Sequence, residues 1–176
     1  TWQNMGLHDS HHISRILINP SNTDEVVVGV VGHLYSKNEE RGIFKTTNGG
    51  KTWNKTLYID DETGIIDVAV SPKNFNVQYA ASWSKDRKAW DFIGSGATSG
   101  IYKSEDAGLT WKLFTTAESG FPVGEGVGRI GLAVYDDATV YAVLDNQFKR
   151  PLESKKSNSL PIAFSVPGDE FLKIPN

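Results

Sequence analysis

The chain alternates short apolar segments with clusters of turn-forming residues. Each segment has about the length of a strand and is rich in β-branched or aromatic residues, and Gly, Asn, Asp or Pro lie between the segments. The segments span 13–20, 26–32, 42–47, 52–58, 65–72, 77–83, 100–104, 110–115, 129–134 and 139–145. Helix signals are nearly absent before residue 165. The pattern therefore predicts an all-β fold.

The pattern also repeats. The segment GIFKTTNGGKTW at 42–53 returns 58 residues later as GIYKSEDAGLTW at 100–111. The preceding segments 18–31 and 70–83 align without a gap, and 133–145 is a third version with a shorter turn. The unit is thus strand, turn, strand, long loop, strand, tight turn, strand. Four strands in about 50–60 residues are typical of a β-propeller blade, whereas a sandwich has no such sequence period.

We predict a β-propeller segment of four-stranded antiparallel blades over residues 1–148, comprising about two full blades plus parts of two others. Thr1 and Trp2 look like the end of a preceding hairpin. Because a propeller needs at least about four blades to close, we expect the remaining blades to come from the same polypeptide or another subunit. Residues 149–176 are predicted to be an insertion or extended loop, with a short helix around 169–173.

Both repeated hairpins match the pattern Ser/Thr-x-Asp/Asn-x-Gly-x-Thr-Trp. The matching residues are Thr46, Asn48, Gly50, Thr52 and Trp53, and then Ser104, Asp106, Gly108, Thr110 and Trp111. The pattern resembles the Asp-box, or BNR repeat, of sialidases, xyloglucan-degrading hydrolases and sortilin-type receptors. Segments 9–16, 32–46 and 83–92 are similar to bacterial glycosyl-hydrolase-like or sortilin-like (VPS10-type) proteins. The resemblance covers residues 1–148 and implies an exported protein, located in the periplasm, on the cell surface or outside the cell.

The chemistry of the hairpin favours a structural role. Asn48 and Asp106 can accept hydrogen bonds from backbone N–H groups of their own turns. Trp53 and Trp111 are expected to bury their rings between blade layers. A calcium loop would need a spaced run of carboxylates, which the hairpin lacks.

A ligand site is expected on the opposite face. In an up-and-down blade the long connections 7–12, 32–41, 59–64, 83–99 and 117–128 lie on one face and the tight turns on the other, and function favours loops on a rigid scaffold. The predicted ligand-binding residues are His12, His33, Arg41, Trp83, Arg87 and Trp90. Indole rings can stack on a sugar or a peptide side chain, and arginines can bind a carboxylate. The alternatives are that Trp83 packs under its loop and that Arg41 pairs with Glu39 or Glu40.

Charge and composition exclude several functions. The net charge of −3 comes without a polybasic run, which argues against nucleic acid and anionic membranes as partners. The longest run of apolar residues and glycine, 26–32, is too short to cross a bilayer, so no membrane insertion is expected. The absence of cysteine removes disulfides and thiol catalysis. We expect no cofactor. His8, His11, His12 and His33 invite a metal interpretation, but their spacing is not diagnostic, and we predict no metal site.

Three functions follow from these observations. The first is a recognition module that binds a glycan or peptide on the long-loop face. The second is a glycoside hydrolase, sialidase-like or xyloglucanase-like, in which two carboxylates act across the scissile bond. Asp61 and Asp86 are the nearest candidates for such a pair, but the sequence identifies no catalytic set. The third is a scaffolding propeller.

Overall fold

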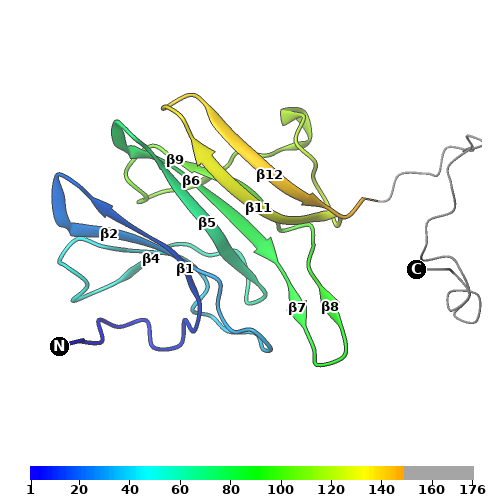
Figure 1. Cartoon of the computed structure of the whole chain (residues 1–176), viewed down its shortest axis with the longest axis horizontal. Helices are drawn as coiled ribbons and strands as arrows, with labels where there is room; N and C mark the ends of the chain where they lie inside the picture. Colours follow the sequence, from blue (N-terminus) through cyan, green and yellow to red (C-terminus); the bar gives the residue numbers. More distant parts are fainter. Residues whose placement is uncertain (149–176) are drawn as a thin grey trace, which may run out of the picture.

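Two four-stranded antiparallel sheets form the body of the molecule, seen in a computed structural model that describes residues 1–148 (Figure 1). The first sheet has the strand order β1 (Ile13–Asn19), β2 (Asn22–Val30), β3 (Gly42–Thr46) and β4 (Asn54–Leu57). The second contains β5 (Thr63–Ser71), β6 (Asn74–Ser84), β9 (Gly100–Ser104) and β10 (Lys112–Leu113) in the same meander. The expected insertion and helix in 149–176 lie outside the described residues.

Two hairpins and a short helical turn complete the fold. The small hairpin of β7 (Asp86–Arg87) and β8 (Phe92–Ile93) lies between β6 and β9. A 3₁₀ turn, η1 (Ala117–Ser119), precedes the antiparallel hairpin of β11 (Val127–Val134) and β12 (Val140–Asn146). The first sheet packs on the second, and β11 packs on β5 and β6 (Figure 1).

The predicted all-β fold of four-stranded antiparallel blades is therefore confirmed. Residues 13–57 and 63–113 form two complete blades, and β11 with β12 forms the leading hairpin of a third unit. Trp2, which was expected to end an earlier hairpin, lies in an N-terminal segment without strand structure and is fully exposed.

The core lies between these units because strand side chains alternate between the two faces of a sheet. Val27 and Ile43 point toward the second sheet and pack with Ile65, Val68 and Ala80. The next cluster consists of Val77, Tyr79, Ala81, Ile101, Val127 and Ile130, between the second sheet and β11. A smaller cluster of Val28, Val30 and Phe44 covers the opposite face of the first sheet, against Leu7 and Trp53. The continuous apolar run in β2 thus reflects burial on both faces.

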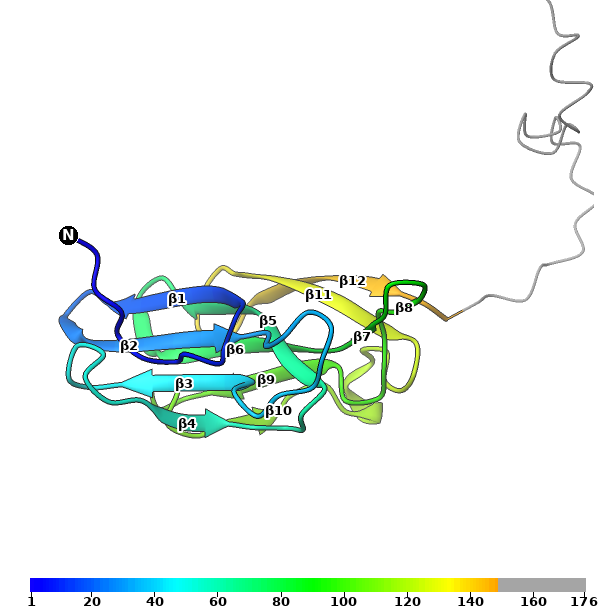
Figure 2. The same ribbon diagram turned by 90° about the horizontal axis from the view of Figure 1, so that it is seen from below.

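The meander also sorts the connections. Successive strands run in opposite directions, so the turns at 20–21, 47–53, 72–73, 105–111 and 135–139 lie at one edge. The loops 31–41, 58–62, 85–99 and 114–126 lie at the other, together with the β7–β8 hairpin (Figure 2). We call these loops, with the N-terminal segment 7–12 that packs against them, the long-loop face.

Candidate functional site

The first repeated hairpin is held by hydrogen bonds within its own turn. The hydroxyl of Thr46 donates to Oδ1 of Asn48 at 2.9 Å and accepts from the backbone N–H of Gly50 at 3.0 Å. Oδ1 of Asn48 also accepts from the N–H of Thr52 at 3.0 Å. Gly50 has a φ of +84°, in the left-handed region that glycine adopts without strain. The polar side chains of this hairpin are therefore used to shape the turn.

The second hairpin repeats this arrangement with different residue types. The hydroxyl of Ser104 donates to Oδ1 of Asp106 at 2.8 Å and accepts from the N–H of Gly108 at 2.9 Å. Asp106 accepts from both the N–H of Thr110, at 2.8 Å, and its hydroxyl, at 2.5 Å. Burial raises the pKa of Asp106, but the hydrogen bonds from Thr110 and Ser104 outweigh it and lower the pKa overall. A structural role accounts for these contacts.

The two tryptophans lie at equivalent positions, but both are half-buried, so the expected burial is incomplete. Trp111 packs between the two sheets, and its indole N–H lies 3.2 Å from the carbonyl of Gly108 and 3.3 Å from the hydroxyl of Thr56. Trp53 packs on the outer face of the first sheet and donates to the carbonyl of Met5 at 2.7 Å. Trp53 is thus covered by a short N-terminal segment, and Trp111 by a neighbouring sheet.

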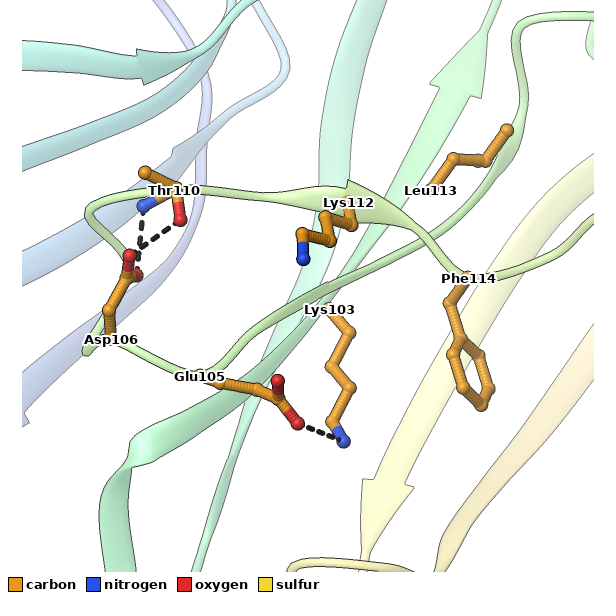
Figure 3. A pocket seen from close by; sticks show the side chains of 7 residues that line it. All are labelled: Lys103, Glu105, Asp106, Thr110, Lys112, Leu113 and Phe114. Atoms are coloured by element: carbon orange, nitrogen blue, oxygen red, sulfur yellow. Dashed lines mark hydrogen bonds and ion pairs between the residues drawn. The ribbon is translucent and has the colours of Figure 1, made fainter.

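A hollow of about 350 Å³ lies beside the second hairpin (Figure 3). Its lining residues are Lys103, Glu105, Asp106, Thr110, Lys112, Leu113 and Phe114. Lys103 pairs with Glu105 at 2.8 Å, and its equivalent in the first blade is Lys45, which is buried and donates to the carbonyl of Ala107 at 2.7 Å. In the first blade, the face that carries Lys45 packs against the second blade. The hollow lies on the equivalent face of the second blade, and we interpret it as a packing surface.

An open groove of about 450 Å³ lies on the long-loop face. Carboxylates from three connections line it, namely Asp60, Glu62, Asp86 and Glu125, with hydroxyls of Ser84, Ser95 and Thr98 between them. Lysines balance part of this charge, because Glu62 pairs with Lys37 at 2.7 Å and Asp86 with Lys88 at 2.9 Å. The groove is therefore rich in hydrogen-bonding groups, and lysines balance only part of its negative charge.

Hydrogen bonds to the backbone hold the loops that form the walls of this groove. Asp60 accepts hydrogen bonds from the N–H groups of Glu62, at 2.9 Å, and Thr63, at 2.6 Å. Lys85 is buried and donates to the carbonyl of His33 at 2.9 Å. Burial lowers the pKa of Lys85, and the neighbouring positive charges of Arg41 and Arg87 lower it further. The loops thus meet as a rigid surface.

Arg41 has a different role from the one the sequence predicts. Its side chain is 2% exposed, and its guanidinium donates to the carbonyls of Val31 (2.7 Å), Ser36 (2.8 Å), His33 (3.1 Å) and Glu62 (3.1 Å). It does not form the expected alternative pair with Glu39 or Glu40, because its donors bind backbone carbonyls. Arg41 therefore positions the loops and is too deeply buried to meet a ligand directly.

The other predicted aromatic and arginine residues belong to the β7–β8 hairpin and its base. Trp83 donates to the carbonyl of Gly94 at 2.8 Å and packs edge-on against Phe92, so it packs under its loop, as the alternative held. The guanidinium of Arg87 lies over the ring of Phe92, 5.3 Å from its centre. Trp90 at the hairpin tip is 85% exposed. Of these three residues, Arg87 and Trp90 are open to a ligand.

The predicted histidines separate into two environments. His12 immediately precedes β1, and its Nδ1 is 3.0 Å from the carbonyl of Gly32. His33 instead stacks on His11 with ring centres 3.7 Å apart, and its Nε2 lies 2.9 Å from Oδ1 of Asp9. Asp9, His11 and His33 form a compact group of potential metal ligands, whereas no metal site is predicted from the sequence.

Asp9, Lys85 and Glu125 are among the residues of this face that the sequence did not single out. Asp9 lies within the histidine-rich segment, but its partner His33 is 24 residues away. Lys85 and Glu125 stand in polar loops where nothing in the local pattern separates them from solvated residues. The only signal was that all three lie on long connections.

No helix within residues 1–148 is long and apolar enough to cross a membrane.

No family model matches this chain, and no curated protein matches it. Several solved structures are similar to it, two of them GH74 enzymes. The first, an ancestral GH74 enzyme, is 19% identical with a TM-score of 0.47, covering 74% of this chain and 16% of the enzyme. The second, the GH74 enzyme of Niastella koreensis, is 17% identical with a TM-score of 0.42, covering 77% of this chain and 20% of the enzyme. The chain thus spans a fifth or less of the length of each.

Proposed function

We propose that this chain is part of an exported Asp-box β-propeller whose long-loop face binds a carbohydrate. The observation that carries the proposal is the groove lined by Asp60, Glu62, Asp86 and Glu125, which lies at the loop edge of two rigid sheets. Further blades, from the same polypeptide or another subunit, complete the ring around these sheets.

The chemistry of the groove favours an uncharged, polyhydroxylated ligand. Carboxylates accept hydrogen bonds from neighbouring sugar hydroxyls, and the hydroxyls of Ser84 and Thr98 can donate or accept. The exposed indole of Trp90 offers an apolar face of the kind on which a sugar ring stacks. An acidic glycan would meet like charge in this groove. A short peptide with a basic or amide side chain is the alternative ligand.

We test the proposal by screening the 176-residue chain on a glycan array and titrating the hits by calorimetry. Glu125→Gln is expected to weaken binding about tenfold, a loss of about 1.4 kcal/mol, because it removes a carboxylate that lines the groove. Trp90→Ala is expected to weaken binding to a similar extent, because it removes the exposed ring of the hairpin whose Asp86 and Ile93 line the groove. Lys51→Ala, on an exposed turn at the opposite edge, is the matched control and should bind as the unchanged chain does.

Two results would overturn the proposal. One is a ligand whose affinity depends on Lys51 and not on Trp90 or Glu125. The other is that no neutral glycan binds on the glycan array while peptides bind on a peptide array, which would establish the alternative ligand.

Glycoside hydrolysis is the second candidate, because carboxylates from separate connections face one groove. Retaining and inverting hydrolases both use two carboxyl groups on either side of the scissile bond. Asp86 and Glu125 are the pair to test in this chain, since the carboxylate of Asp61 lies 4.0 Å from the amine of Lys37 and Asp61 does not line the groove. Release of sugar from xyloglucan or sialosides by the unchanged chain, lost in both Asp86→Asn and Glu125→Gln, would establish the hydrolase.

A further inference from the structure

We propose that Asp9, His11 and His33 form a binding site for a zinc-class divalent metal ion. One potential ligand atom from each side chain lies within 4.8 Å of the others. Ligand atoms on a single tetrahedral ion are about 3.4 Å apart when the bonds are about 2.0–2.2 Å long. Two stacked imidazole rings do not direct their nitrogen lone pairs at one point, so we expect His11, which is exposed like Asp9, to rotate out of the stack when an ion binds. This inference does not rest on the proposed carbohydrate site.

The backbone is already arranged to hold His11 against His33. Leu7 and His11 have φ angles of +55° and +50°, a left-handed conformation that is costly for residues other than glycine. The turn between them is held by the hydroxyl of Ser10, which donates to the carbonyl of Leu7 at 2.8 Å. As a result the two imidazole rings stack with centres 3.7 Å apart and planes 18° from parallel. Such strained positions are concentrated at functional sites.

A buried amide fixes the two segments relative to each other. Nδ2 of Asn38 donates to the carbonyl of Asp9 at 2.7 Å, and its Oδ1 accepts from the N–H of His33 at 3.0 Å. On the other side of the imidazole, Nδ1 of His33 lies 2.8 Å from the hydroxyl of Ser36. Histidine ligands commonly have such a partner on the second ring nitrogen, because it fixes the ring orientation and leaves the first nitrogen for the metal.

The donor set selects the class of metal. Two imidazoles and one carboxylate suit zinc and other late transition metals, whereas Mg²⁺ and Ca²⁺ prefer oxygen ligands. Three protein ligands leave a fourth position open to water or to an external ligand. A bound ion would also tie the segment 7–12 to the loop 32–38.

The test is calorimetric titration of the metal-free 176-residue chain with zinc chloride at pH 7.5. We expect one site on the unchanged chain and at least a 100-fold loss of affinity in both His11→Ala and His33→Ala. The matched control is His8→Ala, which removes an exposed histidine of the same segment that lies outside the ligand group. It should bind zinc as the unchanged chain does, and magnesium should not compete.

A melting experiment separates ligand loss from misfolding. A ligand that binds only the folded state raises the melting temperature, so zinc should stabilise the unchanged chain and His8→Ala but not His11→Ala. His11→Ala should keep the far-ultraviolet circular dichroism spectrum of the unchanged chain, because His11 is exposed. The proposal fails if the unchanged chain binds no zinc at 100-fold metal excess, or if His11→Ala binds as tightly as the unchanged chain.

Discussion

At the scale of single residues, Asn48 and Asp106 hold equivalent turns with an amide and with a carboxylate. Each accepts from the N–H four residues later, at 3.0 Å and 2.8 Å respectively. We therefore expect Asp106→Asn to lower the free energy of unfolding by less than about 1 kcal/mol at pH 7, and Asp106→Ala by about 1–3 kcal/mol because its partners lose their acceptor. Urea unfolding measures both.

The small cost of Asp106→Asn should depend on pH. The pKa of Asp106 in the folded protein lies below its ordinary value of 3.8, because hydrogen bonds from Thr110 and Ser104 outweigh the effect of burial. A lowered pKa contributes stability above the ordinary value, and this is lost as the pH falls through the folded value. The stability difference between the unchanged chain and Asp106→Asn should therefore shrink below pH 3.8. A difference that grows on acidification would contradict this assignment.

At the scale of elements, the same tryptophan has different neighbours in the two blades. Trp111 packs between two sheets, while Trp53 lies between the first sheet and the N-terminal segment. We expect Trp111→Ala to lower the free energy of unfolding by about 2–4 kcal/mol, somewhat less than a fully buried ring would cost because it is half-buried. Trp53→Ala should lower the free energy of unfolding by a smaller amount, because only the N-terminal segment covers this ring.

Thermal melts of the two variants decide this prediction. The matched pair controls for residue type and for position within the repeat, so a difference reports the packing between blades. Equal shifts for both variants would show that the N-terminal segment packs as firmly on Trp53 as a sheet does on Trp111.

At the scale of the whole molecule, two equivalent lysines distinguish an inner from an outer sheet face. Lys45 is buried between the sheets, pairs with Glu25 and donates to the carbonyl of Ala107. Lys103 is one quarter exposed and pairs with Glu105 on the surface. We expect Lys45→Met to lower the free energy of unfolding by about 3–5 kcal/mol, because Glu25 is left partly buried without its partner. Lys103→Met should lower it by less than about 1 kcal/mol, because its ion pair is on the surface.

Denaturant unfolding of the two variants measures this contrast, and the double variant Lys45→Met with Glu25→Gln shows how much of the cost comes from the orphaned carboxylate. If Lys103→Met costs as much as Lys45→Met, the outer face is buried in solution. The hollow around Lys103 would then be occupied by a further blade or by another copy of the chain.

The sequence by itself determined the strands, their turns and the repeating unit. These features depend on residues close in the chain: the apolar runs of β2 and β3, whose side chains alternate between two buried faces, and the hydrogen bonds within four residues of Thr46 or Ser104. The opposite placement of tight turns and long loops also followed, because strand direction alternates in a meander.

Only the tertiary structure decided which loop residues act together. The predicted ligand residue Arg41 proved to be buried because three backbone carbonyls of its own loop and the carbonyl of Glu62 from the next connection converge on it. Asp9 and His33 meet because Asn38 joins two segments that the sequence separates by 24 residues. The carboxylates of the groove likewise come from separate connections. No local pattern encodes such meetings, because they depend on how independent loops fold over the edge of the packed sheets.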